Sequence, residues 1–356
     1  MRVPAASAAW IPQAYCLALT AVICAPSFAP GYLLHRDLVS TPQSFLTDTA
    51  LGVSEGAPRA VPQDAAVAVL STVVDGGLIV KIAIFAALLL SGLGADYLAR
   101  TVLTGMRTGP RIVAVTVAVW NPFVAERLLQ GHWSLLTGYA GMLWAVSFAY
   151  TLRIDPRDRI GWLGLAVSLT AAALTPTGGV LAGIVTVVAL ADRGRPLAAA
   201  CGLWLVANAP WIVASIGGTV RSDPDAVAAF AARAEPWLGT LGSLAGLGGI
   251  WNAEAVPASR TSPLALVGTI VLIAVVAVGA RAAVRAGAIA KRLAVVAVVA
   301  VLAPALLATG WGVEVLELLV ESVPGAGLLR DTQKFVCLAV PFYVLAARHP
   351  AAAART

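Results

Sequence analysis

Apolar residues along the chain fall into long runs that short polar segments separate. Each run lies near the length of about 20 residues that a helix needs to cross the hydrocarbon core of a bilayer. Stretches such as 264–279 do not alternate between polar and apolar residues, so they predict helices rather than barrel strands. The pattern predicts about ten spans, with ends uncertain by several residues, at 14–34, 78–99, 112–126, 133–152, 160–175, 178–191, 197–217, 263–280, 293–311 and 335–347.

Composition supports the same fold class. Of the 356 residues, 59% are hydrophobic and 12% are charged, whereas a soluble domain carries about 25% charged residues. We therefore expect an all-α, polytopic transmembrane protein that forms one domain over 1–356, with membrane lipid as its main solvent. The four cysteines lie inside apolar runs without metal-like spacing, and we expect them to be small buried hydrophobic residues.

The last predicted span, 335–347, is short, and an Ala-rich segment beginning at His349-Pro350 follows it. Two interpretations stay open. The sequence lacks a natural C-terminal portion, or the last span is a short tilted or partial helix.

Basic residues gather on one side of the predicted membrane. With a cytoplasmic N-terminus, the inside segments hold fifteen of the 24 basic residues, which agrees with the positive-inside rule. The outside segments, chiefly the outer loops about 35–77, 218–262 and 312–334, hold the other nine and most acidic residues, and we expect these loops to pack on the membrane domain. We expect a bacterial plasma-membrane protein whose working face is outside, and the high pI gives no reason to expect a nucleic-acid partner. The fifteen are Arg2, Arg100, Arg107, Arg111, Arg153, Arg157, Arg159, Arg193, Arg195, Arg281, Arg285, Lys291, Arg292, Arg348 and Arg355.

The first outer loop opens with a charged triplet, His35-Arg36-Asp37, directly after the first predicted span. A carboxylate at this boundary stays ionised and can act as a general base, which makes Asp37 the candidate catalytic residue. His35 and Arg36 beside it are candidate substrate-binding residues. The alternative is that Asp37 only ends the helix and pairs with an arginine.

Arg59 and Asp64 lie farther along the same loop. They are candidate binding residues, and the alternative is a local ion pair or helix cap. The segment 65–74 that follows is apolar with polar breaks and predicts a helix on the membrane surface.

A second polar cluster begins where Asn121-Pro122 interrupts an apolar run. Broken helices at membrane depth usually line a cavity, so this break is not expected to face lipid. Glu126, Arg127 and His132 follow it as candidate binding residues. The alternative is an interfacial Glu126–Arg127 pair with a solvated histidine.

A third cluster, which includes Arg330, Asp331 and Lys334, leads into the last span. Arg330 and Lys334 are four residues apart, so a continuing helix would place both cations on one face, where they suit a phosphate. A salt-bridge cluster at a helix start is the alternative. In the long loop, Trp251 follows two glycines and could form a platform for a sugar ring or rest on lipid headgroups.

The layout resembles the GT-C class of polytopic membrane glycosyltransferases, in which an acidic residue opens the first outer loop, as Asp37 does here. The commonest pattern in that class is an acidic pair, and Asp37 has no acidic neighbour. The segments around Asn121-Pro122 and 330–334 are similar to uncharacterised actinobacterial membrane proteins of this kind.

The resemblance implies transfer of a sugar from a polyprenyl-phosphate donor to a glycan or lipid acceptor of the cell envelope. Asp37 would take the proton of the acceptor hydroxyl, while Arg330 and Lys334, together with Arg36, would hold the lipid phosphate. No metal-ligand set is predicted, and the cofactor stays open, a divalent cation included. The alternatives are a transporter or flippase of a lipid-linked or anionic substrate, and a non-catalytic membrane scaffold. Charges inside the predicted spans are few and the two halves show no repeat, which disfavours transport.

Overall fold

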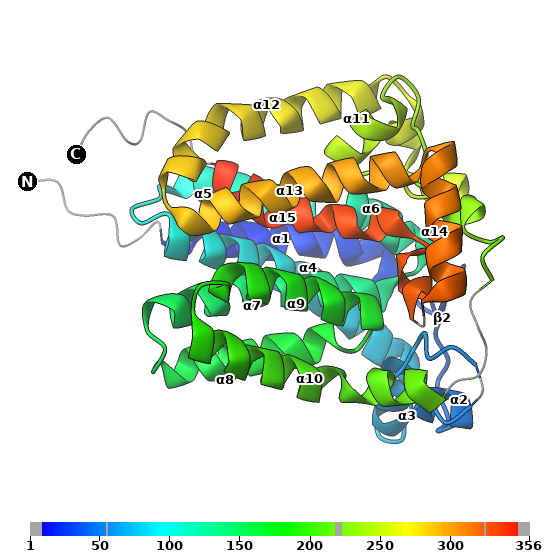
Figure 1. Cartoon of the computed structure of the whole chain (residues 1–356). Helices are drawn as coiled ribbons and strands as arrows, with labels where there is room; N and C mark the ends of the chain where they lie inside the picture. The colour runs from blue at the N-terminus through cyan, green and yellow to red at the C-terminus, as the bar shows by residue number, and fades with distance from the viewer. Residues whose placement is uncertain (1–8, 55, 218–222, 324, 348–356) are drawn as a thin grey trace, which may run out of the picture.

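The computed structural model describes residues 9–54, 56–217, 223–323 and 325–347. Helices lie side by side with their axes roughly parallel and form a bundle (Figure 1). Residues 29–54, 56–75, 223–263, 309–323 and 325–334 gather at one end of the bundle, which we call the loop end. Short connections with many arginines lie at the other end, which we call the basic end. Arg2, Arg348, Arg355 and the predicted C-terminal tail lie outside the described residues.

In the described part of the chain, seven helical segments are long and apolar enough to cross a membrane. They are α1 (Ile11–Cys24) continued by η2 (Ala25–Phe28), α4 (Gly76–Val102), α5 (Thr108–Val119) with α6 (Pro122–Gln130), α7 (Trp133–Ile154), α10 (Gly194–Gly217), α12 (Leu264–Arg285) and α13 (Ala288–Leu307). Three shorter apolar segments are α8 (Arg159–Ala172), α9 (Pro176–Leu190), and η7 (Thr332–Ala339) with α15 (Val340–Ala346). A multi-pass helical membrane protein is thus confirmed, while the count of ten spans stays a prediction.

The centre of the bundle is α7, which packs against α4, α8 and α9. A Cβ atom added at Gly138 of α7 would lie 2.6 Å from the Cα atom of Gly178 in α9. This contact brings two helix backbones close together, as small residues do in membrane proteins. By contrast, few residues of α10 and α12 are buried, so these helices present their exposed apolar side chains to lipid.

The loop end contains short elements of its own. The first loop holds a hairpin of β1 (Leu34–His35) and β2 (Leu38–Val39), followed by α2 (Asp48–Leu51) and α3 (Gln63–Leu70), so the helix expected at 65–74 begins and ends earlier. In Figure 1, α14 (Gly310–Ser322) runs across the end of the bundle, at a steep angle to α13. The remaining elements there are η3 (Ala228–Phe230), α11 (Gly239–Ala245), η4 (Ala253–Ala255), η5 (Ala258–Thr261) and η6 (Ala326–Leu329).

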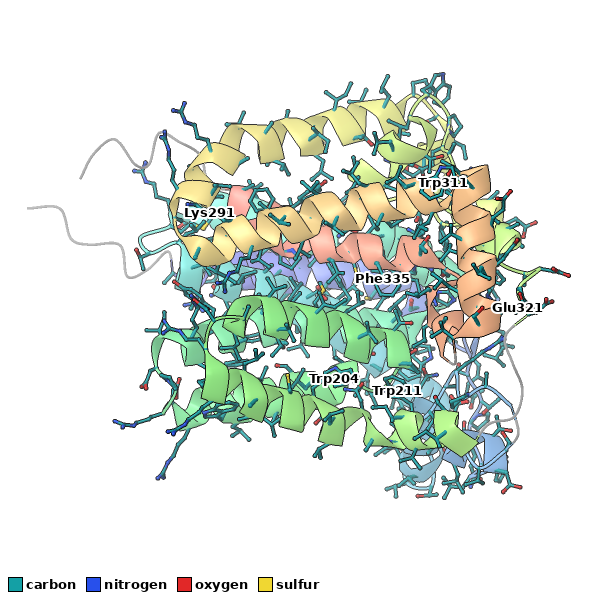
Figure 2. All side chains as sticks on the ribbon, in the orientation of Figure 1. Trp204, Trp211, Lys291, Trp311, Glu321 and Phe335 are labelled. Atoms are coloured by element: carbon teal, nitrogen blue, oxygen red, sulfur yellow. The ribbon has the colours of Figure 1, made fainter. Side chains whose placement is uncertain are left out.

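The basic end is held together by ion pairs. Asp192 pairs with Arg153 of α7 and, at 3.1 Å, with Arg292 of α13. Asp96 of α4 pairs with Arg111 of α5 at 2.6 Å. Figure 2 shows the asymmetry of the bundle, with Lys291 at this end and Trp311 and Glu321 at the loop end.

Candidate functional site

The β-hairpin carries Asp37 at its turn. Leu34 pairs with Val39 and His35 with Leu38, which leaves Arg36-Asp37 as the two turn residues. The first helical segment ends at Phe28, so the expectation that Asp37 directly follows the first span is wrong. The turn, rather than a helix end, positions the carboxylate.

Arg36 adopts a left-handed backbone conformation with φ of 51°, which costs a residue with a side chain about 1–2 kcal/mol. Its side chain offsets this strain with hydrogen bonds. The guanidinium donates to the carbonyl of Leu129 at 2.5 Å, to that of Glu254 at 2.7 Å and to the His35 ring at 2.6 Å. These hydrogen bonds hold the turn against α6 and the long loop. The side chains of Arg36 and His35 are therefore engaged in contacts within the protein.

The hairpin rests on the C-terminal end of α6. The amide of Asp37 donates to the carbonyl of Gln130 at 3.2 Å. Gly131 caps α6 with φ of 88°, and a Cβ atom there would lie 2.4 Å from the amide nitrogen of Leu38 and 2.9 Å from the carbonyl oxygen of His35. Both the backbone angle and the close approach require glycine at this position.

The Asp37 carboxylate meets two donors through its Oδ2 atom: Gln130 Nε2 at 2.9 Å and His132 Nε2 at 2.8 Å. On the far side of the imidazole, Nδ1 lies 3.1 Å from NH1 of Arg127. A guanidinium can only donate hydrogen bonds, so Nδ1 accepts and Nε2 carries the proton that it donates to Asp37. The neighbours of His132 thereby define its tautomer.

The ionisation of this pair follows from its contacts. The hydrogen bond from His132 holds the pKa of Asp37 below its usual value, and burial lowers the pKa of His132. A neutral imidazole therefore donates to an ionised carboxylate. The Asp37 side chain keeps 55% of its surface exposed, and Oδ1 has no hydrogen-bond donor among the described residues, so it can receive a proton from a ligand.

Arg127 extends the contacts to the last helical segment. Its side chain is fully buried, and NH1 lies 3.5 Å from Oδ2 of Asp331. Lys334 Nζ lies 3.8 Å from the same oxygen. We call Asp37, His132, Arg127, Asp331 and Lys334 the polar series. It joins the first loop to the segment before the last helix.

Glu126 and Arg127 do not form an interfacial pair, because both side chains are fully buried and each has other partners. Glu126 accepts hydrogen bonds from the backbone amides of Gly249 and Ile250, both at 3.2 Å, and from Gln333 Nε2 at 3.5 Å. It therefore fastens the long loop and η7 to α6. His132 is likewise a contact residue rather than a solvated histidine, since it joins Arg127 to Asp37.

Arg330 and Lys334 do not share a helix face. η6 ends at Leu329 and η7, a 3₁₀ helix, begins at Thr332, so no α-helix runs through both cations. The guanidinium carbon of Arg330 lies 3.9 Å from the centre of the Phe230 ring. Burial lowers the pKa of Arg330, and the positive charge of nearby Arg59 adds to this effect.

Trp251 packs against the aromatic ring on which Arg330 lies. Its ring centre lies 4.6 Å from that of Phe230, whose face Arg330 covers. The indole nitrogen is buried and has no hydrogen-bond partner in the described part of the chain. Trp251 thus packs within the protein beside Arg330 instead of lying flat on its surface.

Asp64 stands apart from the polar series. It lies in the first turn of α3, where it accepts a hydrogen bond from Gln63 Nε2 at 3.1 Å, and burial raises its pKa. Although both residues are described, no ion pair joins Asp64 to Arg59. Of these two candidates, only Arg59 affects another candidate residue, because its positive charge lowers the pKa of Arg330.

Three polar residues of the site, Gln130, Asn252 and Gln333, were not among the candidate residues. Gln130 contacts Asp37 with its amide nitrogen, and its amide oxygen accepts a hydrogen bond from Asn252 Nδ2 at 2.8 Å. Gln333 reaches Glu126 from η7. Gln130 lies one turn after Glu126 in the second polar cluster, and Gln333 lies within 330–334 in the third, so both positions offered a usable signal, whereas Asn252 gave none.

A cavity of about 460 Å³ lies beside the break between α5 and α6 and extends along α12. Trp120, Asn121 and Pro122 line it from the break, which agrees with the expectation that a broken helix borders a cavity. Its walls are mainly apolar, and Arg260, which pairs with Glu235, is its charged residue. The cavity can therefore take an apolar chain with a polar group near one end.

Among the described residues, no group of three or more His, Cys, Asp or Glu side chains converges as a metal site would require. Comparison of the chain with protein-family models, curated proteins and solved structures finds no match. The function must therefore be inferred from the chemistry of the polar series.

Proposed function

We propose that this chain is a membrane glycosyltransferase that moves a sugar from a polyprenyl-phosphate donor to a hydroxyl acceptor of the cell envelope. The observation that carries the proposal is the polar series. It connects a half-exposed carboxylate, Asp37, with a cation, Lys334, through three buried or half-buried side chains. A base and a cation in one connected site are what such a transfer needs.

In the proposed reaction, the acceptor oxygen attacks the anomeric carbon of the sugar as the bond from that carbon to the phosphate oxygen breaks. The acceptor proton passes to Oδ1 of Asp37, and the electron pair leaves with the phosphate. His132 and Gln130 hold Oδ2 in place, so the carboxylate keeps one orientation toward the acceptor. Its lowered pKa keeps it ionised at neutral pH.

The leaving phosphate needs positive charge where its own charge develops. Lys334 contacts Asp331 only at 3.8 Å, so its ammonium can still donate to a ligand. Arg330 and Arg59 add two further cations at the same end. The mainly apolar cavity of about 460 Å³ beside α6 suits the first part of the lipid chain.

The proposal also places the loop end on the outer face of a bacterial plasma membrane, with the N-terminus in the cytoplasm. Short arginine-rich connections at the basic end support this orientation under the positive-inside rule. The acceptor would then be a glycan or lipid of the envelope.

The test is Asp37→Asn, which keeps the shape of the side chain and removes the base. We expect transfer from a polyprenyl-phosphate sugar in isolated membranes to fall by about 100-fold or more, with insertion unchanged. Asp48→Asn, at an exposed carboxylate of the same loop, is the control and should transfer at the parental rate. Parental transfer by the Asp37→Asn protein would show that Asp37 is not the base. A parent protein that moves lipid-linked sugar across vesicles without transferring it would favour the flippase alternative.

A further inference from the structure

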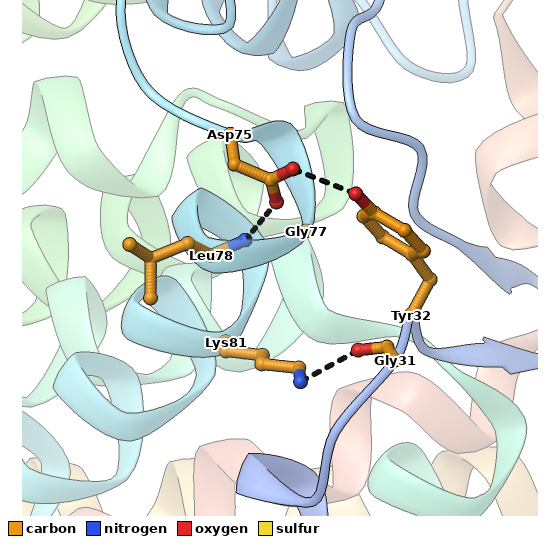
Figure 3. A pocket seen from close by; sticks show the side chains of 6 residues that line it. All are labelled: Gly31, Tyr32, Asp75, Gly77, Leu78 and Lys81. Atoms are coloured by element: carbon orange, nitrogen blue, oxygen red, sulfur yellow. Dashed lines mark hydrogen bonds between the residues drawn. The ribbon is translucent and has the colours of Figure 1, made fainter.

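A second, smaller cavity, separate from the polar series, lies at the start of α4. It has a volume of about 210 Å³ and is lined by Gly31, Tyr32, Asp75, Gly77, Leu78 and Lys81 (Figure 3). At about 30 Å³ per water molecule, this is the space of roughly seven waters. The cavity therefore suits a small polar group.

Lys81 supplies its positive charge. The side chain is only 8% exposed, and Nζ donates to the carbonyls of Ala29 and Gly31, both at 2.8 Å. An ammonium has three donors, so one remains for another partner. Among the described residues, no carboxylate lies within ion-pair distance of Lys81, although a buried charge requires compensation.

Asp75 supplies the negative charge at the outer edge. Its Oδ1 caps α4 by accepting from the amide of Leu78 at 3.0 Å, and Oδ2 accepts from the Tyr32 hydroxyl at 2.7 Å. The residue is exposed, so each oxygen keeps a lone pair for a further donor. Figure 3 shows Asp75 and Lys81 on the same side of α4, with Asp75 directed at the Tyr32 hydroxyl and Lys81 at the Gly31 carbonyl.

The two charges lie at different depths along one helix. Six residues separate Asp75 from Lys81, a rise of about 9 Å at 1.5 Å per residue. Leu78 and Ile82 of the same helix are 44% and 52% exposed, as lipid-facing residues are. The cavity thus opens where the apolar surface of α4 gives way to the loop end.

We propose that this cavity binds the headgroup of a phosphatidylethanolamine lipid, with the phosphate on Lys81 and the ammonium on Asp75. In a bilayer the phosphate of such a lipid lies deeper than its amine, which matches the order of the two residues. Phosphatidylcholine has no N–H to donate to Asp75. Phosphatidylglycerol has no cation to place there.

The experiment uses the full chain in nanodiscs that contain equal amounts of phosphatidylethanolamine, phosphatidylcholine and phosphatidylglycerol, followed by gentle release and native mass spectrometry of the retained lipids. We expect phosphatidylethanolamine to be retained in preference to the others. Lys81→Met should lower this retention about tenfold, the effect of one charge-assisted hydrogen bond. Lys291→Met, the same change at an exposed lysine of the basic end, should leave it unchanged.

Asp75→Asn is the second variant, because asparagine caps helices as well as aspartate does and the fold should persist. It should remove the preference over phosphatidylcholine while keeping the bound phosphate. Equal retention of the three lipids by the parent protein would overturn the proposal. An unchanged preference in Asp75→Asn would overturn it as well, even if Lys81→Met fails to fold.

Discussion

At the scale of single residues, Arg127 has the widest influence on the polar series, although it touches no proposed substrate. Because its guanidinium can only donate, it sets the proton of His132 on Nε2, and that proton points at Asp37. A change at Arg127 would therefore free the imidazole to take the other tautomer. The orientation of the proposed base depends on a residue two contacts away.

The His132 environment predicts a specific loss of stability in mild acid. Its folded pKa is lowered from 6.5 by burial, so the unfolded chain takes up a proton at higher pH than the folded protein does. The stability that follows is complete above pH 6.5 and is lost as the pH falls through the lowered folded value. We expect thermal unfolding of the purified protein to shift downward over that window, and His132→Gln to show a smaller shift.

The titration of Asp37 does not interfere with this measurement, because it occurs at a lower pH than that of His132. Its pKa is lowered from 3.8, so its contribution is present above 3.8 and disappears only as the pH falls through a still lower value. An acid shift of equal size in the parent and the His132→Gln protein would assign the titration to another group.

Local signals explain which residues could be predicted. Asn121 before Pro122 is a helix start, and the Asn121 side chain does accept from the amide of Val124 at 3.1 Å. The partner of Asp37 was beyond such reasoning, because His132 lies 95 residues away in the sequence. Only the packing of the hairpin on α6 brings the two together.

At the scale of elements, the contact between the hairpin and α6 depends on Gly131. We predict that Gly131→Ala lowers the free energy of unfolding by more than the roughly 1–2 kcal/mol that a left-handed backbone alone costs, because the added Cβ atom meets Leu38. Transfer activity should fall with it, since Asp37 would lose its position. Denaturant unfolding in detergent and the transfer assay measure the two effects.

Gly105→Ala is the matched control for this variant. Gly105 has φ of 76°, and a Cβ atom there would meet nothing within 4 Å. The difference in the free energy of unfolding between the two variants therefore measures the effect of the contact with the hairpin. Equal losses at both positions, with activity retained, would mean that the hairpin is not held by this approach.

Glu126 provides a second test at this scale. In Glu126→Gln an amide nitrogen replaces one carboxylate oxygen and faces the donors of Gly249 or Ile250. A buried donor left without an acceptor costs about 1–3 kcal/mol, so we expect destabilisation of that size in detergent unfolding. Glu314→Gln, at an exposed position of α14, should cost nothing measurable. A neutral Glu126→Gln variant would show that the long loop does not depend on this carboxylate.

The elements differ in how well the sequence predicted them. Long apolar helices followed from length and composition alone, because lipid requires both. The helix expected through 330–334 failed for a physical reason. Spacing of four residues assumes an α-helix, whereas Asp331 contacts Arg127 between two 3₁₀ segments. Such a tertiary contact produces no periodic pattern in the sequence.

At the scale of the whole molecule, the proposed orientation can be measured directly. Arg157 and Arg285 are exposed at the basic end, and Asp48 is exposed at the loop end. Cysteines introduced at the first two should react with an impermeant reagent only after intact cells are opened, while one at Asp48 should react at once. The native cysteines are buried except Cys201, so Cys201→Ala is the background. Labelling at 157 in intact cells would reverse the orientation and place the site inside.

The contacts between α6 and η7 can form only late in the synthesis of the chain. Glu126 and Gln333 are separated by 207 residues, and Arg127 likewise waits for Asp331. A ribosome releases α6 long before η7, so on the nascent chain Arg127 and Glu126 have no partners from that segment. Intermediates of membrane insertion would therefore contain Glu126 and Arg127 among already inserted helices without their partners from residues 331–346. Membrane chaperones and quality-control proteases can recognise such unpaired charges. The arrival of residues 331–346 would complete the proposed site and end that exposure in a single step.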